Sequence, residues 1–529
     1  MERDPSVHDV VVVGGGPGGA SAAALLARRG CDVALLTRVS PPASALAESI
    51  PPSARGLLDR VGVLEHLDGS GLHANGGNTV WWAEGRERSE SFAPDSGGFQ
   101  AERGRLEEIF AEHARDEGAR VLRGRAVRRI RREDLRGGPP LWRIDRPDAP
   151  SLRARWVLDA TGRAGLMAKP ALREPDERTP TLALVRRWRV PESVVGTRGT
   201  HTLVESYPDG WAWSVPLAST ERCVTAMVDP RRTGLRRAAG LSAMYDAEIA
   251  KTHHLRRILA DAAPAGDAWA CPASLYTARS FGGPGFLLVG DAGSFIDPLS
   301  SYGVKKALAS GWLAAVVVGT ALEQPWMEEA ARAFHDARER LVYRSYRRLS
   351  APFFREAALA YGHPYWEGRA AAAEEGGGPV PTTDPADRLT SAHEGHEVLP
   401  DRGAVEAAWT ALRNREGLRA VPGRSLRLVS RPVLDGERIA MAPHLATDPF
   451  PGGIRFAHGV VLPDLVREAP AHADVPSLYE ACARRHPGLS LPAFLTALST
   501  AFAAALLEHA DEVALADRRA GRQDVPFPR

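Results

Sequence analysis

The first part of the chain alternates between short apolar runs and one helix-like stretch. Four successive valines at residues 10–13 predict a buried strand, and residues 32–36 predict a second one. Between them, a glycine turn precedes an alanine-rich segment at residues 18–29 that has the composition of a helix. A strand, a helix and a second strand within about 30 residues make a βαβ unit. The pattern therefore predicts a Rossmann-like α/β domain with a parallel sheet.

The middle of the chain has a different period. Alternating apolar and polar positions predict antiparallel strands at residues 181–189, 202–207, 211–216 and 223–228. We expect these strands to form a separate substrate domain, an antiparallel β-sheet at approximately residues 178–280, inserted into the nucleotide-binding domain. Around this insertion, the pattern predicts a helix at 105–116, a hairpin formed by 120–131 with 141–144, strands at 155–158 and 286–289, and helices at 302–322 and 327–348.

Periodicity is lost at residues 371–401, where glycine, proline, threonine and acidic residues predict a linker between residues 1–370 and 402–529. The last part is predicted to be an α+β module with a helix at 404–415, strands at 426–429, 438–442 and 453–458, and helices at 476–485 and 493–510. This module is either a winged-helix-like peptide-binding domain or a cap over an active site. Its mixed charge argues against a winged helix that binds DNA.

Composition excludes several classes of protein. The 529 residues are 44% hydrophobic and 25% charged, which excludes a disordered or fibrous chain. A formal net charge of +2 gives no field that would attract nucleic acid or an anionic membrane, and the apolar stretch at 312–318 is expected to be core. The four cysteines are scattered without a CxxC pair, so we expect a cytoplasmic protein without a metal or disulfide site. Only four of the 67 basic residues are lysines, at positions 169, 251, 305 and 306.

The glycine turn after the first strand has a nucleotide-binding pattern. Gly14 allows the tight turn, Gly16 lets a pyrophosphate approach the backbone, and Gly19 lets helix and strand pack closely. The helix N-terminus adds unpaired N–H donors. The alternative is a turn with a structural role only. The acidic residue that usually contacts a ribose is absent after the second strand, where Arg38 either contacts adenosine or phosphate or lies in solvent.

Four further motifs point to the cofactor by resemblance. They are AESIPP at residues 47–52, RGRLE at 103–107, DATG at 159–162 and GDAGSFIDP at 290–298. With them, residues 8–350 resemble the flavin-dependent halogenase-like branch of the FAD-dependent monooxygenase superfamily. The resemblance implies FAD as cofactor and O2 as co-substrate, with reduction by NAD(P)H directly or through a partner flavin reductase. The residues expected to bind FAD are Gly14, Gly16, Gly19, Arg38, Arg103, Gly290, Asp291, Gly303 and Val304.

Two tryptophans lie in GWAWSVP, residues 210–216, which resembles a halogenase signature. On a strand, Trp211 and Trp213 point to the same face. They are either core residues beneath the flavin or a wall that shields the oxygen-activating side of the flavin.

The absence of lysine from residues 1–168 bears on the reaction. In the halogenases that this chain resembles, a lysine between the segments corresponding to 47–52 and 103–107 is thought to direct hypohalous acid. Arginine cannot replace an amine nucleophile, because its guanidinium stays protonated. Residues 71–82, GLHANGGNTVWW, instead resemble halogenase-like proteins that oxidise or oxygenate substrates, including tryptophan side chains of partner proteins. Glu48 or His73 is then the candidate catalytic acid or base, unless each is a fixed structural group.

The segment SSYGVKK, residues 300–306, stands where halogenases have a halide-binding turn. Tyr302 in place of threonine is expected to crowd this turn and to weaken halide binding. One of Lys305 and Lys306 is expected to lie in solvent, because neighbours in a helix point about 100° apart.

The sequence therefore predicts an FAD-dependent monooxygenase or oxidase that acts on an aromatic, indole-like substrate in a biosynthetic pathway. The substrate is either a small molecule or is borne by a peptide or carrier protein. Two alternatives stay open. One is a flavin-dependent halogenase of an aromatic substrate, and the other is a peptide-binding flavoprotein whose function is recognition. No nucleic acid, membrane or metal is expected as a partner.

Overall fold

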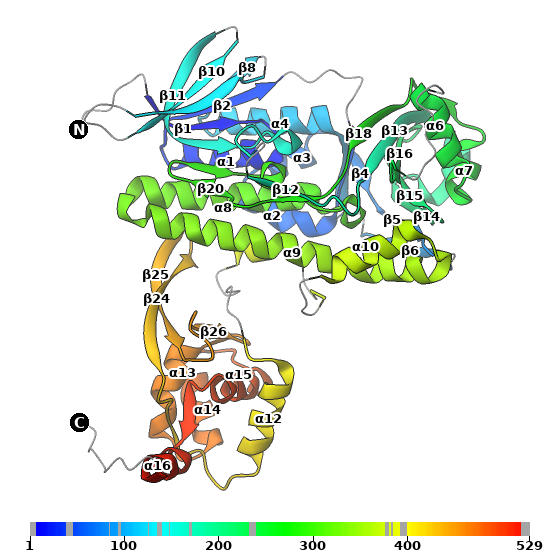
Figure 1. Ribbon diagram of the computed structural model, residues 1–529. Helices are drawn as coiled ribbons and strands as arrows, with labels where there is room; N and C mark the ends of the chain where they lie inside the picture. Colours follow the sequence, from blue (N-terminus) through cyan, green and yellow to red (C-terminus); the bar gives the residue numbers. More distant parts are fainter. Residues whose placement is uncertain are drawn as a thin grey trace. The chain divides into compact units, whose positions relative to one another are not determined.

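The computed structural model describes residues 7–519 except 39–45, 84, 94–96, 125, 135–139, 148, 169–171, 232–239, 376–379, 382–383 and 392–398. Lys169 and parts of the predicted 371–401 linker thus lie outside the described residues. The chain divides into two compact units, Met1–Thr390 and Ser391–Arg529, and each is described by itself (Figure 1).

A mostly parallel sheet carries the nucleotide-binding motif of the first unit. Its strands run in the order β20, β21, β11, β1, β2 and β8, and the pairings from β21 to β8 are parallel. The strands are β1 (Val7–Val13), β2 (Val33–Arg38), β8 (Arg120–Gly124), β11 (Ala149–Asp159), β20 (Gly282–Gly283) and β21 (Phe286–Leu288). The parallel pairing of β1 with β2 across helix α1 (Pro17–Arg28) confirms the predicted Rossmann-like βαβ unit.

Small residues of α1 allow two helices to come into backbone contact. The helix begins at Pro17, whose fixed φ suits the first helical position. A Cβ added at Gly18 would lie 2.5 Å from the carbonyl oxygen of Ala307, in helix α8 (Gly303–Glu323). The close approach places the N-terminal ends of α1 and α8 next to each other at the edge of the sheet.

The predicted hairpin of 120–131 with 141–144 is wrong in its pairing. β8 joins the parallel sheet beside β2, whereas β9 (Arg129–Glu133) and β10 (Leu141–Arg146) form the hairpin and extend it to β11. Alternation along a strand identifies its buried face but does not identify its partner strand.

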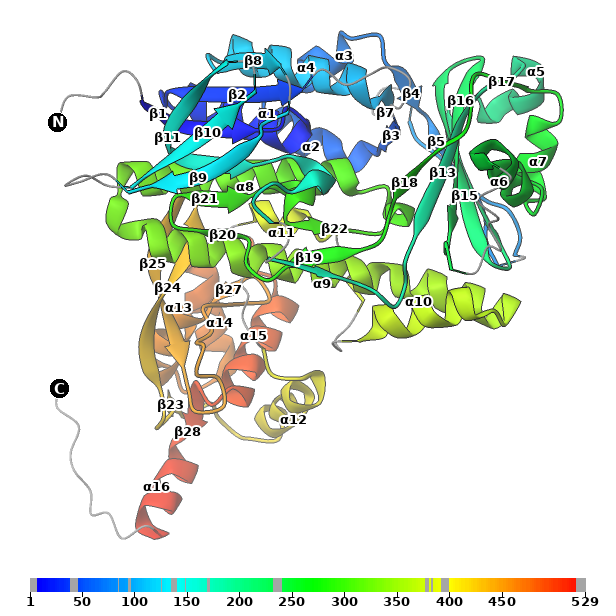
Figure 2. The same ribbon diagram turned by 45° about the horizontal axis from the view of Figure 1, so that its top comes forward.

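The predicted inserted sheet is confirmed and is larger than expected. Its strands run in the order β17, β13, β16, β15, β14, β5 and β6, with β18 also paired to β13. They are β5 (Gly77–Trp81), β6 (Arg88–Ser91), β13 (Leu182–Arg189), β14 (His201–Tyr207), β15 (Gly210–Ala218), β16 (Glu221–Val228), β17 (Ala263–Pro264) and β18 (Trp269–Pro272). Figure 2 shows this sheet beside the parallel one, with α6 (Gly240–Ile249) and α7 (His254–Leu259) against it.

Shorter elements connect the two sheets. One small sheet has the order β3, β7, β4, and another has the order β12, β19, β22. Their strands are β3 (Ala47–Ile50), β4 (His73–Asn75), β7 (Gly98–Glu102), β12 (Arg173–Pro175), β19 (Tyr276–Ala278) and β22 (Ser294–Phe295). The helices of this region are α2 (Arg55–Arg60), α3 (Leu64–Asp68) and α4 (Arg103–Asp116).

Long helices complete the first unit. Among the described residues, α8 is the one helix long and apolar enough to span a membrane, and nearly all of it is buried in this unit. It packs against α1 and against α9 (Glu328–Tyr361), which lies beside it in Figure 1. Burial thus accounts for the apolar stretch 312–318, as predicted. The helices α10 (Pro364–Glu374) and α11 (Asp387–Thr390) occupy parts of the segment predicted to be an irregular linker.

The second unit is an α+β module, as predicted. Its paired strands are β23 (Ala420–Pro422) with β28 (Leu507–His509), β24 (Arg427–Asp435) with β25 (Arg438–Ala446), and β26 (Phe456–Ala457) with β27 (Val460–Val461). Its helices are α12 (Arg402–Arg413), α13 (Leu462–Glu468), α14 (Val475–Arg485), α15 (Leu491–Ala503) and α16 (Ala510–Arg519). The winged-helix identity of this unit stays a prediction.

Candidate functional site

Three turns that the sequence places far apart meet at the carboxyl edge of the parallel sheet. The N–H of Gly14, after β1, donates to the carbonyl of Leu36 at 2.8 Å. The N–H of Ala160, after β11, donates to Val13 at 2.9 Å, and that of Val289, after β21, donates to Asp159 at 2.9 Å. The edge of an α/β sheet where parallel strands end is the usual place for a ligand.

The glycine turn has the shape of a phosphate cradle. Gly14 has φ +116°, and a Cβ there would lie 2.1 Å from the carbonyl oxygen of Ala160, so only glycine fits. A Cβ at Gly19 would lie 2.1 Å from the carbonyl oxygen of Gly14. At Gly16, in contrast, the nearest atoms to an added Cβ are 4.0 Å away, and no side chain caps the helix. The open space and the free N–H groups of α1 fit a pyrophosphate.

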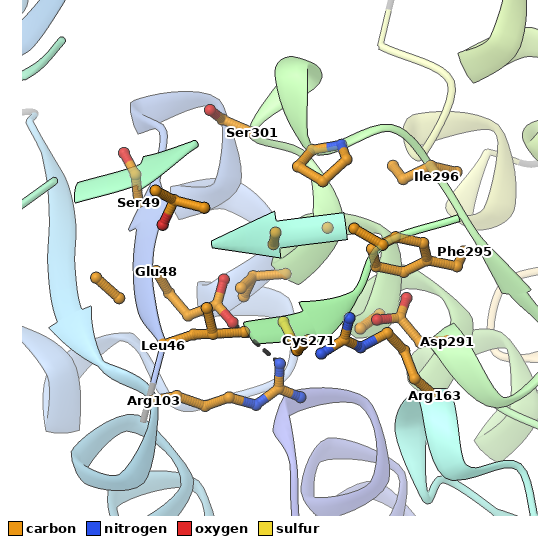
Figure 3. Close-up of a pocket in the computed structure, with 18 of the residues that line it drawn as sticks. Leu46, Glu48, Ser49, Arg103, Arg163, Cys271, Asp291, Phe295, Ile296 and Ser301 are labelled. Atoms are coloured by element: carbon orange, nitrogen blue, oxygen red, sulfur yellow. Dashed lines mark hydrogen bonds and ion pairs between the residues drawn. The ribbon is translucent and has the colours of Figure 1, made fainter. Parts of the chain in front are cut away.

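A pocket that is partly open to solvent adjoins this cradle at Pro17. Its polar wall includes Glu48, Arg103, Arg163 and Asp291. Figure 3 shows Glu48 and Arg103 pointing toward one another, with Arg163 and Asp291 on the other side and Cys271 between them in this view. Strand β3, helix α4 and the turns after β11 and β21 supply the four charged side chains.

Glu48 and Arg103 form an ion pair in the pocket wall. Glu48 Oε1 lies 3.1 Å from Arg103 Nη1, and Arg103 Nε donates to Glu107 Oε1 at 3.1 Å. Burial raises the pKa of Glu48 above its ordinary value, against the opposing charge of Arg103. A carboxyl group with a raised pKa beside a cation is equipped to hold or release a proton.

Asp291 offers a carboxylate oxygen to the pocket. Its Oδ1 atom is buried and has no hydrogen-bond partner, although a buried polar atom is normally satisfied. Tyr276 Oη donates to the main-chain carbonyl of Asp291 at 2.5 Å, which holds the turn. The unpartnered oxygen fits the sequence-based expectation that Asp291 accepts a hydrogen bond from a ribityl hydroxyl of FAD.

Gly303 and Val304 line the same pocket at the first turn of α8. The preceding residue of the wall, Ser301, has φ +53°, a conformation that non-glycine residues rarely adopt. Such strain is usually kept where a turn must present its backbone to a ligand. The N-terminus of α8 therefore presents main-chain groups to the pocket, where the flavin ring is expected.

The other end of the pocket is apolar and belongs to the inserted sheet. Trp213, Thr225 and Met227 line it from β15 and β16, Cys271 lines it from β18, and Phe295 faces it from β22. The pocket thus joins the nucleotide cradle to an aromatic and aliphatic surface on the second sheet. Such a shape suits a cofactor at one end and a flat, uncharged substrate group at the other.

The two tryptophans share a face, as predicted, but have different surroundings. Trp213 lines the pocket. Trp211 is buried in the core of the inserted sheet, 5.8 Å from the ring of Trp213 and 6.5 Å from that of Trp82. The position of Trp211 therefore suits a core residue, and the position of Trp213 suits a residue of the wall that shields the flavin.

His73 and Arg38 do not line the pocket. His73 Nε2 lies 3.4 Å from the carbonyl oxygen of Gly199, and burial lowers the pKa of the ring. The contact with Gly199 therefore supports a structural role for His73, and no contact with the pocket supports a role as acid or base. Arg38 is exposed at the carboxyl end of β2, so either alternative for it stays a prediction.

Two expectations about residues 300–306 are wrong. The Tyr302 ring packs against Tyr346, with centroids 5.8 Å apart, and Tyr302 is not part of the pocket wall, so it does not crowd the predicted halide turn. Lys305 and Lys306 are both buried, with 2% and 0% of their surface exposed. Lys305 pairs with Asp384, and Lys306 donates to main-chain carbonyls, so partners distant in sequence replace solvent.

Several wall residues were not singled out from the sequence. Arg163 directly follows the DATG turn, and Asp297 lies inside the GDAGSFIDP motif, so both positions could have been found from those motifs. Burial raises the pKa of Asp297, whose carboxylate accepts from the N–H of Leu299 at 3.0 Å. Cys271 carries no local signal, because only the folding of β18 onto β13 brings it to the pocket.

Comparison with known proteins agrees with this geometry. Residues 7–340 match the FAD binding domain family. The chain is 29% identical over 326 residues to a tryptophan 2-halogenase of Chondromyces crocatus, which covers 59% of this chain and 61% of the halogenase. It is 27% identical over 367 residues to the flavin-dependent halogenase armH1 of Armillaria mellea, which covers 65% and 70%. The chain therefore spans less than two thirds of the tryptophan 2-halogenase.

Solved structures show the same fold. The flavin-dependent halogenase CmlS superposes with a TM-score of 0.71 at 21% identity, over 95% of this chain and 96% of that one. The peptidyl tryptophan dihydroxylase QhpG, essential for tryptophylquinone cofactor biogenesis, has a TM-score of 0.64 at 24% identity, over 94% and 99%. The myxobacterial chondrochloren halogenase CndH has a TM-score of 0.58 at 26% identity, over 69% and 86%.

Proposed function

Because the chain belongs to the FAD binding domain family, we propose that it is an FAD-dependent monooxygenase or oxidase that acts on an aromatic, indole-like substrate. FAD, when bound and reduced, supplies the activation of O2, and the protein supplies binding, orientation and control of protons. The proposal rests on the pocket that joins the nucleotide cradle to the apolar face of the inserted sheet.

The chain's own residues define where FAD is held. The backbone around Gly16 binds the pyrophosphate, with the Arg103 guanidinium beside it. The Asp291 carboxylate, whose Oδ1 atom forms no hydrogen bond within the protein, would accept a hydrogen bond from a ribityl hydroxyl. Gly303 and Val304 present the N-terminus of α8 to the flavin ring.

The observation that favours oxygenation over halogenation is the absence of a lysine from the pocket wall. Of the four lysines, the structure describes three, and none of these lines the pocket. Lys251, which follows α6, pairs with Asp209 in the turn between β14 and β15 at 2.6 Å. The ammonium group of Lys305 pairs with two carboxylates, and that of Lys306 donates to main-chain carbonyls and faces the Asp291 carboxylate. No described amine is therefore placed to direct hypohalous acid toward a substrate.

Glu48 and Trp213 carry the proposed chemistry of the protein. Glu48 has a raised pKa in a partly buried position beside Arg103 and is the general acid or base of the pocket. Trp213 supplies a large apolar surface that keeps water from the reacting groups. Phe295 and Met227 face the same space and suit an aromatic ring.

An indole-like substrate is supported by the names of two similar proteins, a tryptophan 2-halogenase and a peptidyl tryptophan dihydroxylase. The second of these also favours a substrate borne by a peptide or carrier protein, with the second unit of this chain as the candidate recognition module. Reduction by NAD(P)H, directly or through a partner flavin reductase, completes the proposal.

The second candidate function is halogenation of an aromatic substrate, which the curated halogenase relatives favour. One experiment separates the two. The purified protein receives reduced FAD, O2 and either free tryptophan or a tryptophan-containing peptide, with and without chloride or bromide, and product mass is measured. A gain of oxygen that is independent of halide supports the proposal. A halogen isotope pattern overturns it in favour of halogenation.

A further inference from the structure

A buried lysine lies directly behind the Asp291 side of the pocket. Lys306 is completely buried, and its Nζ atom donates to the carbonyl oxygen of Gly290 at 3.2 Å and to that of Ser294. Nζ also lies 3.7 Å from the Oδ1 atom of Asp291. One ammonium group therefore contacts three residues of a five-residue turn, and it has three N–H donors with which to do so.

The same turn is held from a second side. Ser310, one helical turn after Lys306 on α8, accepts a hydrogen bond from the N–H of Gly290 at 2.8 Å. Gly290 has φ +60°, a conformation that glycine adopts without strain and that a residue with a Cβ rarely adopts. Ser310 thus holds the N–H group of Gly290, and Lys306 holds its carbonyl group.

Burial of the charged Lys306 side chain must be compensated by other interactions. Moving an ammonium group out of water is unfavourable unless hydrogen bonds and an opposite charge compensate. Main-chain carbonyls compensate Lys306 in part, and the Asp291 carboxylate lies at ion-pair distance. Asp291 Oδ1 forms no hydrogen bond, so at 3.7 Å Lys306 Nζ acts on this carboxylate through its charge.

We propose that Lys306 is a positioning residue of the FAD site, which fixes the Gly290–Ser294 turn through its carbonyls and orients the Asp291 carboxylate toward the cofactor. Its positive charge, 3.7 Å from the carboxylate of the wall residue Asp291, would also raise the midpoint potential of bound FAD, because a nearby cation favours added negative charge. The inference rests on FAD binding and is independent of whether the product is oxygenated or halogenated.

The chain contains a matched control for this proposal. Lys305 is the adjacent residue on α8 and is also buried, but it forms ion pairs with Asp384 at 2.8 Å and Asp387 at 2.9 Å. These aspartates lie around α11, and neither lines the pocket. Lys305→Met and Lys306→Met therefore remove the same buried charge from neighbouring positions, and only the second change touches the flavin turn.

The test compares the full-length Lys305→Met and Lys306→Met variants. FAD affinity and melting temperature are measured on the FAD-free proteins, and the midpoint potential of FAD is measured on the FAD-bound proteins. We expect Lys306→Met to bind FAD at least tenfold more weakly than Lys305→Met and to have a lower midpoint potential, at similar melting temperatures. Equal FAD affinity and equal potential in the two variants would overturn the proposal.

If Lys306→Met does not fold, Lys306→Arg and Lys305→Arg replace it. A guanidinium keeps the charge but cannot fit the place of an ammonium between the Gly290 and Ser294 carbonyls. The arginine at position 306 is then expected to weaken FAD binding at least tenfold relative to the one at 305, and equal binding overturns the proposal. Failure to turn over any aromatic substrate affects the proposed function and leaves these two readouts unchanged.

Discussion

Glu48 Oε1 lies 3.1 Å from Arg103 Nη1, although the two residues are 55 positions apart in the sequence. The pair forms because β3 and β7 place Glu48 beside the start of α4, where Arg103 is the first helical residue. It brings a carboxyl group with a raised pKa and a fixed cation to the wall of the pocket that also meets the glycine cradle.

Replacement of Glu48 by glutamine is expected to slow product formation by about 100-fold while FAD stays bound, because general acid–base catalysis contributes about that much or more. Glu107→Gln is the matched control, since Glu107 also contacts Arg103 at 3.1 Å but does not line the pocket. Single-turnover rates measured with reduced FAD and O2 distinguish the two. Equal losses in both variants would show that only the charge around Arg103 matters.

A bulky residue at Gly16 should abolish FAD binding, because its side chain would enter the open space in front of the α1 N-terminus. Gly16→Leu is compared with Gly56→Leu, a change at an exposed helical glycine with nothing within 4 Å of an added Cβ. The yellow absorbance that copurifies with each protein gives the result. A fully yellow Gly16→Leu variant would contradict the placement of the pyrophosphate.

Trp213 and Trp211 should respond differently to truncation. Trp213→Ala opens the pocket to water, so a larger share of the consumed O2 should appear as hydrogen peroxide in solution instead of product. Trp211→Ala removes a core side chain and is expected to lower the free energy of unfolding by about 3–5 kcal/mol. Peroxide yield and urea unfolding separate the two effects. A Trp213→Ala variant with unchanged coupling would remove the shielding role.

The local pattern of the chain was sufficient to predict the Rossmann-like unit. Residues 10–13 of β1 are all valine because the strand is buried on both of its faces. Gly14 is required because its φ is positive. Each of these signals lies within a few residues, so periodicity and turn chemistry reveal them.

Pairings across long distances could not be predicted in the same way. The burial of Lys305 depends on Asp384 and Asp387, which belong to a segment that the composition marks as a linker. β5 joins the inserted sheet through its parallel pairing with β14, more than 100 residues later. In both cases the partner lies far along the sequence from the residue or strand that it contacts. The hydrophobic pattern of one strand does not identify the strand that pairs with it.

Glu339 on α9 should make the stability of the protein depend on pH. It is completely buried, faced by Lys306 and Ser310 from α8 and by His335 and Asp336 on its own helix, with Asp291 nearby, and burial raises its pKa from 4.5 to about 7. The unfolded chain releases this proton more easily, so the contribution of Glu339 to stability is present below pH 4.5 and is lost as pH rises to about 7.

Glu339→Gln should therefore be more stable than the native protein at pH 8, by about 2–3 kcal/mol, with a smaller difference at pH 5. Urea unfolding of the FAD-free protein at both pH values gives the comparison. Glu329→Gln, an exposed position on the same helix, is expected to show no such pH-dependent gain. A destabilised Glu339→Gln variant at pH 8 would mean that its carboxylate is required by Lys306.

The most direct test of the central claim uses heavy-isotope O2 with reduced FAD and a tryptophan-containing peptide, in buffer that contains both chloride and bromide, with product mass as the readout. A product that carries heavy oxygen and no halogen is the expected result, because no described lysine lines the pocket that joins FAD to the substrate surface. A product with the isotope pattern of chlorine or bromine, and without heavy oxygen, would contradict the account.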